Sequence, residues 1–217
     1  MPTRVLLADD HAIIRQGLCA LLEKQPDIEV VGAAEDGRKA MELVREMAPD
    51  IVIMDISMPN LNGIDATRRI VGDSAGTKII ALSIHSSQRF VAEMLMAGAS
   101  GYILKECLFD ELMEAIRTVL NGGIYLSPRI TGAVIDDYVK HLSSEREPEK
   151  PVLTEREREV LQLLAEGGST KQIALQLHVS PKTIESNRRN IMNKLGIHNM
   201  AELTKYAVRE GLTPLES

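Results

Sequence analysis

The 217-residue chain has no tryptophan, two cysteines and no hydrophobic run of membrane-spanning length. The cysteines, Cys19 and Cys107, lie far apart without metal-ligand spacing, which fits a reducing compartment and leaves neither as a site residue. No basic and then apolar signal segment precedes the strand-like stretch Val5–Ala8. We therefore expect a soluble, cytoplasmic protein with no membrane partner.

A strongly basic region is also missing. Residues 1–150 contain 16 Lys and Arg against 23 Asp and Glu, net −7, whereas residues 151–217 contain 9 against 8, net +1. Binding to nucleic acid would therefore need a local cluster of cations, because bulk charge does not supply it. The length is sufficient for two domains.

Apolar runs alternate with helical segments through the first 121 residues. Short, continuously apolar runs are typical of strands buried on both faces of a parallel sheet. The segments between them have apolar residues three and four positions apart, as helices do, and a fifth helix is expected over residues 109–120. The pattern predicts an α/β fold, a doubly wound parallel sheet with right-handed crossovers. The five predicted strands are Val5–Ala8, Glu29–Ala33, Ile51–Met54, Lys78–Leu82 and Gly101–Leu104.

Asp55 follows the third predicted strand and comes just before the break at Pro59. Ligands of open α/β sheets bind at the carboxyl ends of the strands. Asp55 could cap the following helix, but other strand ends supply partners for chemistry. We interpret Asp55 as an acceptor of covalent chemistry.

Two adjacent carboxylates, Asp9 and Asp10, follow the first strand. Placed beside Asp55, they would repel one another unless a hard divalent cation lay between them. Mg²⁺ fits, with Asp9, Asp10, Asp55 and the backbone carbonyl of Ser57 as its predicted ligands. Alternatively, the pair only caps the helix that starts near Ala12.

Ser83 ends the fourth strand and Lys105 follows the fifth. At the same sheet edge as Asp55, their hydroxyl and ammonium groups could stabilise phosphate charge together with Mg²⁺. Taken singly, Ser83 is more often a strand-end cap and Lys105 a solvated charge.

With Met58-Pro59, Gly63 and the run Ala97–Tyr102, these residues resemble the receiver domain of two-component response regulators over residues 3–121. The resemblance implies five strands in the order 2-1-3-4-5 and a sensor histidine kinase as partner. It implies Asp55 as phosphoacceptor, Asp9 and Asp10 as magnesium ligands, Lys105 as a phosphoryl contact, Ser83 and Tyr102 as the switch pair, and Ser57 and His85 beside the phosphoryl group. His85 either orients water there or is an ordinary loop histidine.

A linker is expected after residue 121, where Asn121-Gly122-Gly123 stops a helix. Ser127-Pro128 opens a further helix over about 130–142, and a charged stretch with prolines follows to residue 151. We expect that helix to hold the domain that follows the linker inactive. The predicted division is 1–121, a linker over 122–151, and a second domain over 152–217.

The second domain begins with a capping box formed by Thr154 and Glu157. Gly167-Gly168 stops the first helix, and a short helix, a turn and Pro181 as the first residue of the next helix follow. This pattern predicts a small all-α domain with a helix-turn-helix. The second helix of the motif, 181–196, contains four cations and one acid, which supplies the local cluster.

Leu153-Thr154-x-Arg156-Glu157, Val179-Ser180-x-Lys182-Thr183-Ile184 and Lys194-Leu195-Gly196 resemble the LuxR/FixJ-type DNA-binding domain, and the whole chain resembles a NarL/FixJ-family response regulator. By position, the resemblance implies base reading by Glu185, Ser186 and Arg189, and phosphate contacts by Lys182, Thr183, Arg188 and Lys194. It also implies a homodimer on double-stranded DNA with inverted half-sites, and RNA polymerase as a further partner to test.

The expected function is therefore a DNA-binding transcription regulator that phosphorylation on Asp55 activates, and not an enzyme beyond its own phosphorylation and dephosphorylation. One alternative is a DNA-binding regulator with a vestigial receiver that works without phosphorylation. Another is an aspartyl-phosphate phosphatase, which would need an acid two residues after Asp55, where Ser57 stands.

Overall fold

The computed structural model describes residues 1–74, 76–84, 86–106, 109–132, 134–135 and 153–213. These residues form two compact units, one built from residues before 136 and the other mainly from residues after 152. Within the described ranges, no helix is both long and apolar enough to cross a lipid bilayer.

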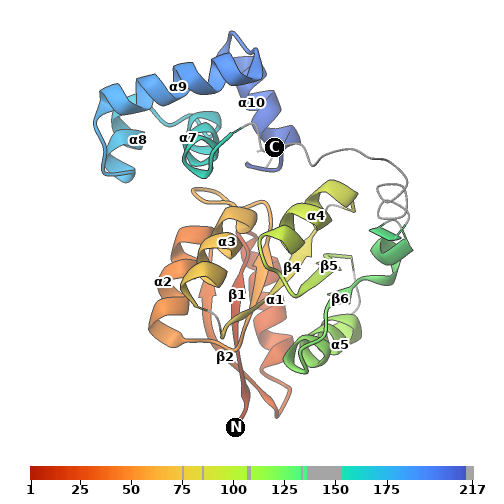
Figure 1. Ribbon diagram of the computed structural model, residues 1–217. Helices are drawn as coiled ribbons and strands as arrows, with labels where there is room; N and C mark the ends of the chain where they lie inside the picture. The colour runs from red at the N-terminus through yellow and green to blue at the C-terminus, as the bar shows by residue number, and fades with distance from the viewer. Residues whose placement is uncertain (75, 85, 107–108, 133, 136–152, 214–217) are drawn as a thin grey trace. The chain divides into compact units, whose positions relative to one another are not determined.

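The first unit is a parallel sheet with helices on both faces (Figure 1). Its strands lie in the order β2-β1-β3-β4-β5-β6. The strands are β1 (Thr3–Ala8), β2 (Ile28–Ala34), β3 (Ile51–Asp55), β4 (Lys78–Ser83), β5 (Gly101–Leu104) and β6 (Tyr125–Leu126). The helices are α1 (Ala12–Leu22), α2 (Gly37–Met47), α3 (Gly63–Asp73), α4 (Gln88–Met96) and α5 (Phe109–Leu120).

The predicted doubly wound fold is confirmed, and the first five strands lie in the expected order. The sheet has six strands rather than five, because β6 pairs in parallel with β5 through Gly101 opposite Tyr125 and Tyr102 opposite Leu126. A two-residue strand is too short to show a period in the sequence.

Apolar residues on both faces of the strands explain why the runs are continuous. On one face, alternate strand residues such as Val5, Ile53 and Ile80 pack with apolar residues of α1 and α5. On the other face α2, α3 and α4 follow one another, with α2 touching α3 and α3 touching α4. All five residues of β3, including Asp55 at its carboxyl end, are consequently buried.

The second unit contains four described helices: α7 (Glu155–Ala165), α8 (Thr170–Gln176), α9 (Pro181–Leu195) and α10 (Met200–Arg209). The predicted capping box of Thr154 and Glu157 is present at α7, and Ser180 caps α9 ahead of Pro181. Gly196 ends α9 in the left-handed conformation, with φ 65°. Ile184 and Ile191 of α9 join the apolar core of this unit.

The start of the predicted linker helix is present, since residues 128–132 and 134–135 are helical. At the start of this helix, the backbone carbonyl of Ser127 accepts the backbone N–H of Ile130 at 2.8 Å. The rest of the helix expected over 130–142, and His85, lie outside the described residues.

Candidate functional site

The carboxyl ends of four strands meet where the sequence analysis placed the site. β1 and β3 are neighbours with Ala8 opposite Met54, so Asp9 and Asp55 follow paired residues. β4 and β5 are neighbours with Ser83 opposite Leu104, so Lys105 follows a residue paired with Ser83. The predicted residues come together because parallel strands end at one edge.

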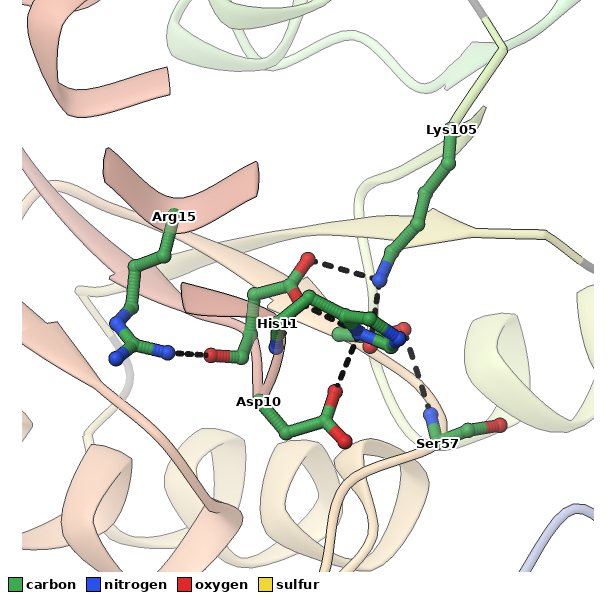
Figure 2. Close-up of polar contacts among 7 residues, drawn as sticks. Asp10, His11, Arg15, Ser57 and Lys105 are labelled. Atoms are coloured by element: carbon green, nitrogen blue, oxygen red, sulfur yellow. Dashed lines mark hydrogen bonds and ion pairs between the residues drawn. The ribbon is translucent and has the colours of Figure 1, made fainter. Parts of the chain in front are cut away.

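An acidic cluster with one ammonium group occupies this edge (Figure 2). Donor atoms of Asp9, Asp10, His11 and Asp55 lie within 4.8 Å of one another. Asp9 and Asp55 are each 3% exposed. Lys105 Nζ lies 2.8 Å from Asp9 Oδ2 and 2.7 Å from Asp55 Oδ2. The three carboxylates exceed the single ammonium by two negative charges, so the residues present fit a divalent cation.

Burial changes the protonation equilibria of the central pair. Burial raises the pKa of Asp55 to about 6, with Lys105 opposing the rise and Asp9 adding to it. Burial lowers the pKa of Lys105, but the carboxylates of Asp55 and Asp9 outweigh this and leave it above its ordinary value. At neutral pH the site therefore holds an ionised, relatively basic Asp55 carboxylate beside a charged ammonium.

Ser83 and Tyr102 are fully buried, both 0% exposed. Burial raises the pKa of Tyr102 to about 12, while a side-chain hydrogen bond with Ser83 lowers it. The Tyr102 side chain is therefore in an inward position in the structure.

Backbone N–H groups that follow β3 donate to the Asp55 side chain and to the neighbouring Ile56 carbonyl. The Ser57 N–H donates to Asp55 Oδ1 at 3.4 Å, and the Gly63 N–H donates to the Ile56 carbonyl at 2.8 Å. A Cβ atom on Gly63 would lie only 1.9 Å from the Asp55 carbonyl oxygen. Only glycine lets α3 begin this close to the strand end. The metal-ligand role of the Ser57 carbonyl stays a prediction.

His11 and Arg15 belong to the site and were not predicted. His11 Nδ1 lies 2.7 Å from Asp10 Oδ1 and 3.1 Å from Asp9 Oδ1. The Arg15 guanidinium donates to the Asp9 backbone carbonyl. The N-cap of α1 is His11, which makes no side-chain cap bond, and the His11 backbone N–H donates to Asp9 Oδ1 at 2.8 Å, so neither aspartate is itself the N-cap residue of this helix. The available signal was the position of His11 directly after the acidic pair, with Arg15 one turn further on.

All the predicted DNA-contacting residues of α9 are exposed: Lys182, Thr183, Glu185, Ser186, Arg188, Arg189 and Lys194. A hollow of about 250 Å³ is lined by Glu185, Arg188, Arg189, Met192, Asn193, Ile197 and His198. Exposed cations beside amide and carboxylate groups can meet phosphates and base edges.

Two of these residues have partners inside their own unit. Lys194 Nζ donates to Glu157 Oε2 at 2.7 Å, which offsets its charge. Thr183 Oγ1 lies 2.8 Å from Ser180 Oγ at the N-cap of α9. Their predicted contacts with phosphates stay predictions.

The sequence matches two known families. Residues 5–117 match the response regulator receiver domain, and residues 151–207 match the bacterial regulatory proteins of the luxR family.

Curated relatives extend along almost the whole chain. The transcriptional regulatory protein DegU of Brevibacillus brevis is 37% identical over 222 residues, covering 96% of this chain and 94% of the relative. The oxygen regulatory protein NreC of Staphylococcus carnosus is 38% identical over 214 residues, covering 96% and 98%.

Solved structures of response regulators match either part of the chain or nearly all of it. A two-component response regulator of the LuxR family from Aurantimonas sp. has a TM-score of 0.61 and 37% identity, covering 64% of this chain and 99% of its own. RcsB from Salmonella enterica serovar Typhimurium, bound to promoter rprA in the presence of the phosphomimetic BeF3−, has a TM-score of 0.61 and 27% identity, covering 95% and 98%. With a receiver domain, a LuxR-type helix-turn-helix domain and full-length relatives that regulate transcription, the chain belongs to the NarL/FixJ family of response regulators.

Proposed function

We propose that the protein is a transcription regulator of a two-component system that phosphorylation of Asp55 activates. The observation that carries this proposal is the buried Asp55 carboxylate, held 2.7 Å from the Lys105 ammonium beside Asp9 and Asp10. A carboxylate oxygen of Asp55 attacks phosphorus, the P–N bond to a phosphohistidine of a sensor histidine kinase breaks, and the imidazole leaves. The products are an acyl phosphate and the free kinase histidine.

Mg²⁺ is the proposed cofactor. Asp9, Asp10 and Asp55 would hold it, with the backbone carbonyl of Ser57, because hard cations prefer oxygen donors and the cluster has excess negative charge. When bound, the cation would neutralise charge on the phosphoryl oxygens. Lys105 would give the same group an ammonium contact, since its Nζ already lies against Asp55.

Ser83 and Tyr102 form the proposed switch. The Ser83 hydroxyl would bond a phosphoryl oxygen, and the buried Tyr102 ring would be stabilised beneath it. Because Tyr102 is inward in the structure, phosphorylation would act by favouring a conformation that the chain already adopts.

The proposed output is binding of a homodimer to double-stranded DNA. Glu185, Ser186 and Arg189 would read base edges, and Lys182, Thr183 and Arg188 would contact phosphates, with Lys194 contributing less because Glu157 pairs with it. A two-fold dimer would require inverted half-sites about one helical turn apart. The capture of RcsB on promoter DNA supports this output by similarity, and reading genomic DNA would place the protein in the cytoplasm.

We also propose the division into a receiver over 1–121, a linker with a helix over 122–151, and a DNA-binding domain over 152–217. The receiver and luxR-family matches, over 5–117 and 151–207, support it. In the family sense the receiver catalyses only its own phosphorylation and dephosphorylation. RNA polymerase is a further partner to test.

A regulator that binds DNA without phosphorylation is the second proposal, and the inward Tyr102 favours it. Selection of genomic DNA fragments by the full-length protein with Mg²⁺, with and without beryllofluoride, separates the two. Enrichment of inverted-repeat fragments only with beryllofluoride supports the switch. Equal enrichment in both supports the second proposal, and no enrichment contradicts both.

A further inference from the structure

Ser127 joins the segment that follows α5 to the strand that carries Tyr102. β6 lies at the edge of the sheet beside β5 (Figure 1). Directly after β6, the Ser127 N–H donates to the Tyr102 carbonyl at 3.0 Å. The Leu104 N–H donates to Ser127 Oγ at 3.3 Å. Ser127 therefore contacts β5 at the proposed switch residue and at the residue before Lys105.

The hydroxyl of Ser127 takes the place of a backbone acceptor. The bonds of a parallel ladder are evenly spaced, so the next one would run from the Leu104 N–H to the Ser127 carbonyl. The hydroxyl accepts this N–H instead, and the carbonyl accepts the N–H groups of Ile130 and Thr131 at 2.8 and 3.1 Å. These two residues lie in the first turn of the linker helix. One residue thus both ends the sheet and begins the helix.

This hydroxyl does not cap the helix that it precedes. A serine at such a position ordinarily turns its oxygen toward N–H groups of its own helix. The Ser127 hydroxyl instead accepts from Leu104 and donates to Glu111 Oε1 in α5. Ser127 is 2% exposed, so water has little access to either bond. The side chain is therefore bound to β5 and α5, on the receiver side of the linker helix.

Two other contacts between the linker helix and the receiver are weaker or lack direction. Arg129 pairs with Glu106, the residue after Lys105, but the two side chains are 74% and 61% exposed, and surface pairs contribute little. Ile130 is 1% exposed, yet apolar burial is non-directional. The hydrogen bonds of Ser127 are directional and end on the backbone of β5. Ser127 is consequently the contact best suited to pass a change in β5 to the helix.

We propose that Ser127 is a positioning residue that couples the phosphorylation switch to the linker helix. The inference rests on the proposed function, because phosphorylation supplies the change at Tyr102 and Lys105. A shift of β5 moves the Tyr102 carbonyl and the Leu104 N–H, and Ser127 moves with both. Its carbonyl then displaces the first turn of the helix, which precedes the second unit in the chain. By linkage, a ligand that restrains the helix changes the affinity of Asp55 for a phosphoryl mimic.

The test compares full-length wild type, Ser127→Ala and Thr131→Ala in Mg²⁺, with and without beryllofluoride. Amide hydrogen exchange at Ile130 measures the response of the helix. The dissociation constant for a selected inverted-repeat DNA fragment measures the output. Thr131→Ala is the matched control, because the Thr131 hydroxyl donates to the carbonyls of Leu126 and Ser127, inside its own segment.

Beryllofluoride should change exchange at Ile130 in the wild type and in Thr131→Ala. Ser127→Ala should still bind beryllofluoride but lose this change. Its gain in DNA affinity should be smaller than that of the wild type by ~2–30-fold, the usual effect of a substitution within a coupled network. Glu111→Ala should act in the same direction, because the Ser127 hydroxyl loses its acceptor. Glu111→Gln keeps an acceptor oxygen and should retain the wild-type response, a rescue that a merely structural role of Ser127 would not require.

Two outcomes overturn the inference. One is a wild-type response in both Ser127→Ala and Glu111→Ala, and the other is loss of beryllofluoride binding in both, which would make Ser127 a support for the acceptor site. A wild type that binds beryllofluoride and responds at Ile130 without a gain in DNA affinity would instead contradict the proposed function and support the coupling. A wild type that does not bind beryllofluoride would contradict both.

Discussion

Gly63→Ala tests how closely α3 must approach the strand that carries Asp55. The added Cβ would lie 1.9 Å from the Asp55 carbonyl oxygen and 2.9 Å from its carbonyl carbon. Both of these atoms belong to the backbone, so no flexible side chain can move aside. To place the new Cβ even 3.0 Å from the carbonyl oxygen, the backbone must move by about 1.1 Å. Overpacking in a core costs about 1–3 kcal/mol, and sometimes more where backbone must move.

Gly72→Ala is the matched control, because Gly72 lies in the same helix and a Cβ there would meet nothing within 4 Å. It should stabilise the receiver by about 0.5–1 kcal/mol, since alanine is the better helix residue. The two variants should therefore differ by about 1.5–4 kcal/mol in the free energy of unfolding.

Native-state hydrogen exchange of the β1 and β3 amides measures this difference for the receiver separately from the second unit. Gly63→Ala should also weaken beryllofluoride binding, because the displaced carbonyl belongs to the acceptor residue. Protection of β3 amides in Gly63→Ala equal to that in Gly72→Ala would refute the reasoning.

Three further predictions concern single side chains. Lys105→Ala should raise the pKa of Asp55 above its present value of about 6, because the ammonium that stabilises the carboxylate is lost. NMR titration of the Asp55 carboxyl group would measure this pKa, and an unchanged value would contradict the prediction. Burial raises the pKa of Glu157, but hydrogen bonds from Lys194 and Thr154 outweigh this and hold the pKa below 4.5. The Glu157 carboxylate therefore stabilises the second unit above pH 4.5, and this contribution is lost as the pH falls through the lowered pKa. Glu157→Gln should remove that part of the acid sensitivity of unfolding, and an unaltered pH profile would count against it. Ser127→Ala should lower the free energy of unfolding of the receiver by about 1–3 kcal/mol, because Ser127 Oγ accepts the backbone N–H of Leu104 in β5 at 3.3 Å. Urea-dependent hydrogen exchange would measure this loss, and a loss below measurement error would show that water replaces the Ser127 hydroxyl as acceptor.

Most of the receiver was predictable because one physical rule places its residues. Continuous apolar runs identify strands buried on both faces, and parallel strands end at one edge, so Asp9, Asp55, Ser83 and Lys105 had to converge. The helix caps at Thr154 and Ser180 were predictable for a similar reason, since capping depends on residues only three positions apart.

The features that the sequence does not reveal depend on contacts between residues far apart in the chain, or on segments of very few residues. β6 has two residues and exists only because β5 offers an edge. The pairing of Lys194 with Glu157 joins residues 37 positions apart, and no local pattern reveals it. The inward position of Tyr102 depends on the space left by its neighbours, which the sequence does not describe. His11 was overlooked because the acidic pair before it explained the site without nitrogen.

DNA affinity as a function of Asp55 phosphorylation is the most direct measurement of the central claim. The dissociation constant for a selected inverted-repeat fragment is compared for wild type and Asp55→Asn, with Mg²⁺, before and after phosphorylation by acetyl phosphate. Phosphorylated wild type should bind about 5–150-fold more tightly than the unphosphorylated protein, the usual range of allosteric coupling, and Asp55→Asn should show no change. Equal affinity in all four samples would contradict control by phosphorylation, and an equal gain in Asp55→Asn would show that Asp55 is not the acceptor.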